Sequence, residues 1–236
     1  MTRFVAFISG KGGVGKTTTA INVGHALHEM GKTVVVVDAN LETPHLGLYL
    51  GLANPKHHIH HFLAGTKMIQ DTIHVHESGL RFIPGSSSIS SIKTDQNQLV
   101  EVIEHLDRTA DFVLLDCSSG FGPDIYHVLR HADESVIVTT PQIPAVTDAL
   151  RALQLAKAHH STIAAVVLNQ INGKHGLDVK EVEEILGVPV FASIKTDDKV
   201  LKAAGMHAPV HYLYPHAQSS AQFRILAEHL TMERKV

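Results

Sequence analysis

Gly10-Lys11-Gly12-Gly13-Val14-Gly15-Lys16-Thr17-Thr18 is the stretch that decides the fold of this 236-residue chain. It fits the phosphate-loop pattern G-x-x-x-x-G-K-[ST], in which Gly10 and Gly15 are the glycines and Lys16 and Thr17 close the pattern. Glycines let backbone N–H groups close around phosphate oxygens, because no Cβ blocks the approach. The lysine of such a loop reaches the β- and γ-phosphates, and the hydroxyl after it binds Mg²⁺. We therefore expect a nucleotide-phosphate site here.

The flanks of the loop support this interpretation. Residues 4–8 form a short apolar run that is typical of a buried parallel strand. Apolar residues then recur at nearly helical spacing over 17–30, and Gly31 follows as a stop signal. A strand, a glycine loop and a helix together place phosphate at a helix N-terminus. This context argues against the alternative of a glycine-rich turn with an incidental Gly-Lys-Thr.

The rest of the chain continues the alternation of strands and helices. Such alternation predicts a three-layer α/β/α fold around a mostly parallel sheet, in a single P-loop domain that spans residues 1–236. Ligands of these folds bind beyond the carboxyl ends of the strands. We expect further strands over 33–38, 81–85, 111–116, 135–140, 162–168 and 188–193, and helices over 99–106, 122–131, 145–158, 179–186 and 219–230.

Composition excludes several classes of protein. No apolar run is long enough to span a membrane, and the first residues run directly into a strand, so we expect no signal peptide. The one cysteine, Cys117, excludes an internal disulfide and any Cys-x-x-Cys site. We expect a cytoplasmic protein. A net charge of −3 is not that of a protein built mainly to bind nucleic acid.

Two aspartates end predicted strands at the edge where the loop lies. Asp116 follows an apolar strand, as in a Walker-B motif that helps to hold Mg²⁺, although a capping or turn aspartate is the alternative. Asp38 ends the strand after the first helix and could orient an attacking water or bind a metal-held water. It could equally cap the next segment, and the two roles are compatible.

The loop carries a second lysine that the phosphate-loop pattern does not need. Lys16 already supplies the cation, so Lys11 could offset negative charge that develops on the phosphates during reaction. The alternative is an ordinary solvated loop lysine.

The run from Lys11 to Thr18 resembles the deviant Walker A box of the MinD/ParA family of ATPases, which belongs to the SIMIBI class. The resemblance covers most of the chain and is strongest to archaeal MinD-like proteins. It extends over Val35-Val36-Val37-Asp38-Ala39-Asn40, Leu114-Leu115-Asp116-Cys117-Ser118-Ser119-Gly120, Thr139-Thr140-Pro141-Gln142 with Thr147-Asp148-Ala149, Val166-Val167-Leu168-Asn169, and Lys202-Ala203-Ala204-Gly205 with Ala208-Pro209-Val210.

This resemblance implies roles for several of the matched residues. Lys11 would be the signature lysine that reaches the phosphates of the partner subunit, in a homodimer with ATP sandwiched at the interface. Asp38 would serve hydrolysis, and Asn169 would contact the base. Thr17 and Asp116 would hold Mg²⁺, and the ATP or ADP phosphates would lie against Gly12, Gly13, Val14, Gly15, Lys16, Thr17 and Thr18.

The chain also departs from the family pattern. Its tail, 231–236, lacks the sustained apolar face and basic flank of an interfacial helix, so we expect no strong membrane anchor. Asn40 stands where many relatives have a second acidic residue, and Cys117-Ser118 where many have Ala-Pro. These departures leave the hydrolysis rate open.

The function that fits best is a slow, partner-stimulated ATPase that acts as a dimerisation switch and recruits or positions a protein partner of unknown identity. A DNA-partitioning ATPase ranks lower, because 20 basic residues against 23 acidic ones form no dense basic run, but DNA binding stays open. A metal or cluster carrier would depend on Cys117 pairing across a dimer axis. A nucleotide-dependent scaffold without turnover is the fourth possibility.

The segment His57-His58-Ile59-His60-His61, with His74 and His76 nearby, suggests a metal site, since imidazole binds Zn²⁺, Ni²⁺ or Cu²⁺. We favour a solvated, histidine-rich surface, because the 19 histidines are spread along the whole chain.

Overall fold

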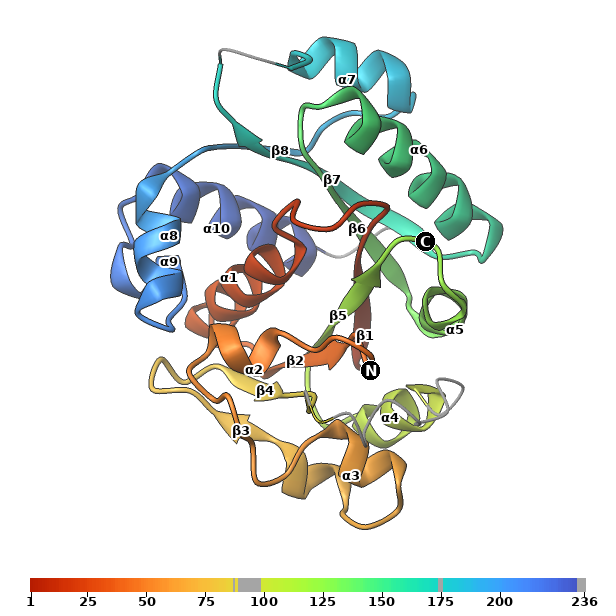
Figure 1. Cartoon of the computed structure of the whole chain (residues 1–236), viewed down its shortest axis with the longest axis vertical. Helices are drawn as coiled ribbons and strands as arrows, with labels where there is room; N and C mark the ends of the chain where they lie inside the picture. Colours follow the sequence, from red (N-terminus) through yellow and green to blue (C-terminus); the bar gives the residue numbers. More distant parts are fainter. Residues whose placement is uncertain (87, 89–98, 174–175, 233–236) are drawn as a thin grey trace.

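One twisted sheet organises the computed structural model, which describes residues 1–86, 88, 99–173 and 176–232. Its eight strands, counted over those residues, follow the order β3-β4-β2-β5-β1-β6-β7-β8, and every pairing but β3 with β4 is parallel (Figure 1). The strands are β1 Arg3–Ser9, β2 Val34–Ala39, β3 His74–Val75, β4 Arg81–Ile83, β5 Phe112–Ser119, β6 Glu134–Thr139, β7 Thr162–Ile171 and β8 Ala192–Lys195.

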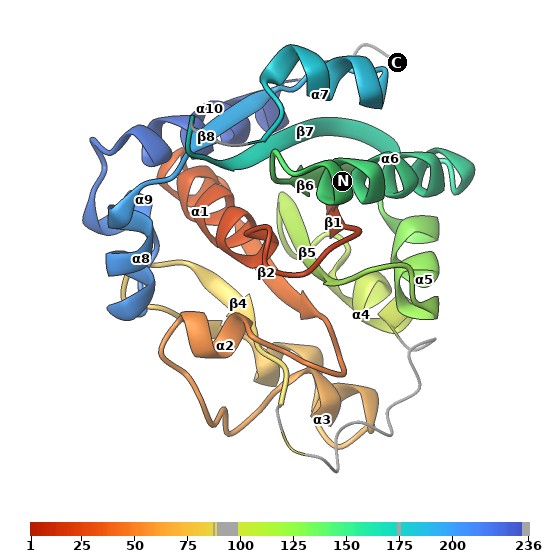
Figure 2. The ribbon, with the colours of Figure 1, turned by 45° about the horizontal axis from the view of Figure 1, so that its top comes forward.

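Helices cover both faces of this sheet, as the alternating sequence pattern predicted (Figures 1 and 2). One face packs against α3 (Ile59–Leu63), α4 (Leu99–Leu106), α5 (Pro123–His131), α6 (Ile143–Ala158) and α7 (Val179–Leu186). The opposite face packs against α1 (Lys16–Glu29), α2 (Leu46–Tyr49), α8 (Asp198–Gly205), α9 (Val210–Leu213) and α10 (Gln218–Thr231).

The strand side chains divide between the two faces by simple alternation. In β1, Phe4, Ala6 and Ile8 belong to the first hydrophobic cluster, whereas Val5 and Phe7 belong to the second. A strand of a sheet that is covered on both faces is buried at nearly every position, which is why these strands appear as nearly continuous apolar runs. Burial on both sides fixes the sheet, and with it the loops at the carboxyl ends of the strands.

The structure corrects one predicted strand. Residues 188–193 were expected to form a strand, but β8 begins only at Ala192 and ends at Lys195. Val188 and Val190 are instead partly buried against the first cluster, as part of the connection that follows α7. The apolar residues there are buried without pairing as a strand. The sequence of a single chain does not distinguish a buried connection from a buried strand.

The sequence patterns did not predict several short helices and a short strand. No predicted range corresponds to the helices α2, α3, α8 and α9, the 3₁₀ turn Ile69–Thr72 or the strand β3. The serine-rich segment that follows the predicted strand 81–85, at 86–91, lies largely outside the described residues, as does the end of the tail at 233–236. Across the described ranges, we find no helix with both the length and the apolar character that crossing a membrane requires.

Candidate functional site

The register of three central strands brings the predicted site residues to one edge of the sheet. In β5, Asp116 pairs with Asp38 of β2 on one side and with Phe7 of β1 on the other. Because β1 leads directly into the phosphate loop, both carboxylates lie beside that loop. The convergence that the sequence predicted is therefore a consequence of strand order.

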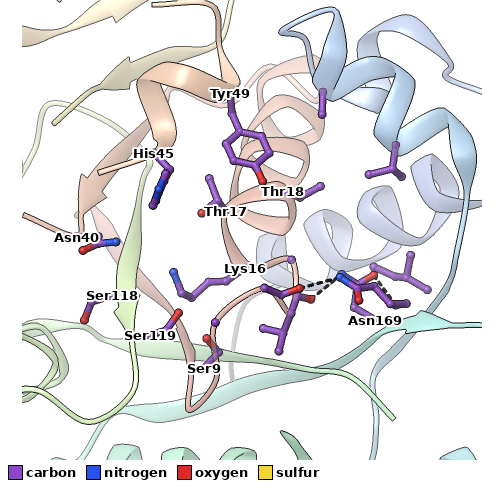
Figure 3. Close-up of a pocket in the computed structure, with 18 of the residues that line it drawn as sticks. Ser9, Lys16, Thr17, Thr18, Asn40, His45, Tyr49, Ser118, Ser119 and Asn169 are labelled. Atoms are coloured by element: carbon purple, nitrogen blue, oxygen red, sulfur yellow. Dashed lines mark hydrogen bonds between the residues drawn. The ribbon is translucent and has the colours of Figure 1, made fainter. Parts of the chain in front are cut away.

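The loop itself depends on glycines with positive φ. Gly13 and Gly15 have φ angles of 77° and 92°, which residues other than glycine rarely adopt. A Cβ on Gly15 would also lie 2.2 Å from Nδ2 of Asn169. That amide donates a 2.8 Å hydrogen bond to the carbonyl of Val14, so β7 supports the loop from the side (Figure 3).

The sequence reasoning did not identify Gln170, which makes a second contact of this kind. Its Nε2 donates a 2.9 Å hydrogen bond to the carbonyl of Gly13. Gln170 has a φ of 56°, an unusual conformation for a residue other than glycine, and this turn aims the side chain at the loop. Gln170 directly follows Asn169 at the end of a strand, and this position is the sequence feature that would have identified it as a site residue.

Lys16 is the first residue of α1 and is buried inside the site. Its Nζ donates a 2.9 Å hydrogen bond to Oδ1 of Asp116 and a second bond to the carbonyl of Cys117. Burial acts to lower the pKa of Lys16, but the Asp116 carboxylate outweighs it, and the pKa is raised overall. The lysine therefore stays charged, and it forms an ion pair with Asp116 of the same chain.

Thr17 contacts the other oxygen of the same aspartate. Its hydroxyl donates a 2.6 Å hydrogen bond to Oδ2 of Asp116. A hydroxyl and a carboxylate are hard oxygen donors, the kind that Mg²⁺ prefers. Thr17 and Asp116 therefore have the donor chemistry of the Mg²⁺ site predicted for them.

Asp38 has a more enclosed position than the sequence suggested. Only 1% exposed, it accepts hydrogen bonds from the backbone N–H of Leu46 at 2.9 Å and of Asn40 at 3.3 Å. Burial, with the nearby Asp116 carboxylate, raises the pKa of Asp38 to about 8. In this structure Asp38 organises the turn that leads into α2, and it is not among the residues that line the pocket.

A pocket of about 1010 Å³ opens in front of the loop. Figure 3 shows Lys16, Thr17 and Thr18 of α1 facing the same hollow as Ser118 and Ser119 of β5 and Asn169 of β7. Its lining includes two groups of residues that the sequence analysis did not predict as site residues: Asn40, Glu42, Thr43, His45 and Tyr49 from the segment after β2, and Ile194, Lys195, Thr196, Asp197, Val200 and Leu201 from β8 and α8.

The strand-end rule that located Asp38 and Asp116 would also have located Thr196 and Asp197, which follow β8 directly. They were missed because the strand was placed too early, at 188–193. Asp197 caps the N-terminus of α8, since its side chain accepts a 3.0 Å hydrogen bond from the backbone N–H of Lys199.

Lys11 differs from Lys16 in its surroundings. It is solvent-exposed and does not belong to the residues that line the pocket, although Gly12 next to it does. The hydroxyl of Ser9 donates a 3.0 Å hydrogen bond to the Lys11 carbonyl, which fixes the backbone there. The two lysines of the loop thus point to different environments, one inside the pocket and one outside it.

The position of Cys117 bears on the carrier hypothesis. The thiol is 1% exposed and packs in the first hydrophobic cluster. Burial raises its pKa well above the ordinary range, and a metal ligand must be a thiolate. A buried, protonated thiol is poorly suited to share a cluster across a dimer axis.

The histidine-rich segment is only partly the solvated surface that we favoured. His60 is 5% exposed, its Nε2 lies 3.0 Å from the Leu41 carbonyl, and its Nδ1 accepts a 3.2 Å hydrogen bond from the backbone of Ser86. His58 stacks on His61 with ring centroids 3.8 Å apart. Among the described residues, no group of three metal-ligating side chains gathers in this segment.

Comparison with known proteins places this site in a family. The family model that matches residues 1–231 is ParA, described as NUBPL iron-transfer P-loop NTPase. An uncharacterised ATP-binding protein of Methanocaldococcus jannaschii is 31% identical over 228 residues, which cover 96% of this chain and 86% of the relative.

Solved structures match along nearly the whole length. The septum site-determining protein MinD of Pyrococcus horikoshii, complexed with Mg-ADP, superposes with a TM-score of 0.92 at 30% identity and covers 98% of this chain and 96% of its own. The MinC:MinD cell division complex of Aquifex aeolicus gives a TM-score of 0.84 at 26% identity, covering 100% and 98%.

Proposed function

Since the chain belongs to the ParA family of P-loop NTPases and is related to the cell-division protein MinD, we propose that it is an ATP-dependent dimerisation switch. ATP and Mg²⁺ would join two subunits face to face, and slow hydrolysis would separate them. The dimer would present a surface that recruits or positions a protein partner.

The contrast between the two loop lysines carries this proposal. Lys16 is buried and bound to Asp116 of its own chain, so it serves the nucleotide in its own pocket. Lys11 is exposed and outside that pocket, so its charge is available to the phosphates of a facing subunit. A cation supplied from across an interface makes the complete site depend on dimerisation.

The pocket supports ATP and Mg²⁺ as its ligands. Loop residues 12–18 would surround the phosphates with backbone N–H groups at the N-terminus of α1, and phosphate oxygens would compete with Asp116 for Lys16. Thr17 and Asp116 would hold Mg²⁺, whose chemistry is to neutralise charge on the phosphates. Asn169, at the rear of the loop, would contact the base.

Hydrolysis would transfer the γ-phosphoryl group of ATP to water, as the bond between the γ-phosphorus and the bridging oxygen of ADP breaks. We assign Asp38 to orient that water. Its carboxyl group accepts hydrogen bonds from the backbone N–H groups of Asn40 and Leu46. Turnover would therefore require the segment after β2 to rearrange, which favours a slow reaction that a partner stimulates.

The proposal also includes a single domain, a protein partner and a cytoplasmic location. We treat residues 1–236 as one P-loop domain, since both hydrophobic clusters pack on a single sheet. The partner would be a protein, as MinC is for the Aquifex aeolicus protein. A cytoplasmic location fits a chain with one cysteine, buried and reduced.

The decisive experiment measures mass in solution by size exclusion with light scattering. The Asp38→Ala variant, which should bind ATP without turning it over, is expected to form a dimer with ATP and Mg²⁺ and a monomer with ADP. Adding Lys11→Ala to that variant should abolish the dimer while ADP binding by calorimetry is retained.

Two results would contradict the proposal. A monomer in every nucleotide state would exclude the switch, and an ATP dimer that survives Lys11→Ala would exclude the role of that lysine. A dimer that forms but shows no phosphate release in the parent protein, with or without a candidate partner, would identify a non-hydrolysing scaffold.

A further inference from the structure

Away from the nucleotide pocket, α1 and α9 bring together the side chains of His25, Glu29 and His211. One potential ligand atom from each residue lies within 4.8 Å of the other two, and this is the one such group of three that we find among the described residues. The two histidines are 1% and 4% exposed, whereas Glu29 lies at the surface. None of the three lines the nucleotide pocket.

The fold holds these residues in place. His25 and Glu29 are four residues apart on α1, so their side chains share one face of the helix. His211 belongs to α9, and its backbone N–H donates a 3.1 Å hydrogen bond to Oδ1 of Asn22 on α1. The three side chains are therefore gathered by secondary structure and by a buried hydrogen bond between the two helices.

One ring nitrogen of each histidine in this cluster, Nδ1, lacks the hydrogen bond that a buried polar atom normally makes. Within the described residues, Nδ1 of His25 and Nδ1 of His211 are both buried without a hydrogen-bond partner. The latter lies 2.8 Å from Oε2 of Glu29, but the two groups are not aligned as donor and acceptor. Leaving such nitrogens unsatisfied costs free energy, and a shared cation would remove that cost.

We propose that His25, Glu29 and His211 form a binding site for a divalent transition metal, with Zn²⁺ as the best-matched ion. Two imidazole nitrogens and one carboxylate oxygen suit Zn²⁺, whereas Mg²⁺ prefers oxygen ligands alone. The site is separate from the one in which Mg²⁺ would accompany ATP.

A metal at this position would have a structural role. α1 begins at Lys16 in the phosphate loop, and Glu29 is its last residue. Bound Zn²⁺ would fasten this far end of α1 to α9, which packs between α8 and α10, while α8 contributes Val200 and Leu201 to the pocket wall. The metal would thus stabilise the side of the fold that supports the nucleotide pocket.

Zinc binding by the untagged, metal-stripped full chain tests the proposal. The protein is dialysed against Zn²⁺ in a chelating buffer that keeps free zinc scarce, and bound metal is measured by mass spectrometry and by competition. We expect one equivalent per chain, and Glu29→Gln and His211→Gln should each weaken binding about tenfold or more. His57→Gln, in the histidine-rich segment, is the matched control and should leave the affinity unchanged.

Folding is checked separately, because His211 is buried. Each variant is compared by circular dichroism and thermal unfolding in EDTA, and Glu29→Gln, at the surface, should match the parent protein there. Zn²⁺ should then raise the Tm of the parent more than that of Glu29→Gln, because a ligand that binds the folded state stabilises it. No bound equivalent, or equal uptake by the parent and Glu29→Gln, would overturn the proposal, the second result placing zinc on other histidines.

Discussion

The hydroxyl of Thr17 donates a 2.6 Å hydrogen bond to Asp116, although the two residues are 99 positions apart in the chain. The first stands at the start of α1 and the second near the carboxyl end of β5, and strand order alone makes them neighbours. Lys16 binds the other oxygen of the same carboxylate. Asp116 is thus the point at which the phosphate loop meets the proposed Mg²⁺ site.

We predict that Thr17→Ala removes most of the effect of Mg²⁺ on ADP affinity, because the variant loses one oxygen ligand. Calorimetric titration of ADP with and without Mg²⁺ measures this, and we expect a loss of about tenfold, or about 1.4 kcal/mol, in the presence of Mg²⁺. Thr17→Ser keeps the hydroxyl and should bind as the parent does. An unchanged Mg²⁺ effect in Thr17→Ala would show that the hydroxyl is not a ligand.

Replacing Lys16 should destabilise the nucleotide-free protein. Lys16→Met leaves the Asp116 carboxylate buried without its cation, and breaking such a pair costs about 3 kcal/mol. Urea unfolding gives the free energy. Lys11→Met, in the same loop but exposed, should change it by less than about 0.5 kcal/mol. Equal effects of the two substitutions would refute the distinction between the lysines.

Two loop glycines offer a matched comparison. Gly13→Ala should cost about 1 kcal/mol, since its φ is 77° and its Cβ would meet nothing within 4 Å. Gly15→Ala should cost about 1 kcal/mol more, because its Cβ would displace Nδ2 of Asn169 from the Val14 carbonyl. Unfolding of both variants by urea checks the order.

A double-mutant cycle isolates the cause of that extra cost. In an Asn169→Ala background the amide is already absent, so the difference between Gly15→Ala and Gly13→Ala should largely disappear. If the difference persists, the strain lies in the backbone at Gly15 and not in the contact with Asn169.

The pH dependence of stability should report on His25. Its pKa is about 4 in the folded protein against an ordinary value of 6.5, so the unfolded chain takes up a proton first as the pH falls. The titration of His25 therefore does not lower the free energy of unfolding above pH 6.5. Below pH 6.5 it lowers the free energy of unfolding progressively as the pH falls towards 4. Over that window, His25→Gln should make the slope of stability against pH shallower by up to about 1.4 kcal/mol per pH unit.

The measurement is urea unfolding at several pH values, in EDTA so that metal binding does not contribute. His131→Gln, an exposed histidine at the end of α5, is the control and should retain the slope of the parent. A slope that His25→Gln does not alter would mean that His25 is protonated at the same pH in both states.

The sequence by itself determined the fold class and the centre of the site. The phosphate loop has a fixed spacing, and strands buried on both faces are apolar throughout, so both leave local patterns that a single chain displays. The helix 179–186 was placed to the residue, and the helix 99–106 agrees with the structure over the described residues, because their apolar positions recur with helical period.

Only the tertiary structure decided which residues meet. Gln170 and Asp197 reach the pocket, and His25 faces His211, and neither kind of contact leaves a periodic trace. Each depends on the order of strands in the sheet and on the packing of helices that are distant in sequence. A local pattern reports the environment of one segment, whereas a site is a property of several segments that the whole fold brings together.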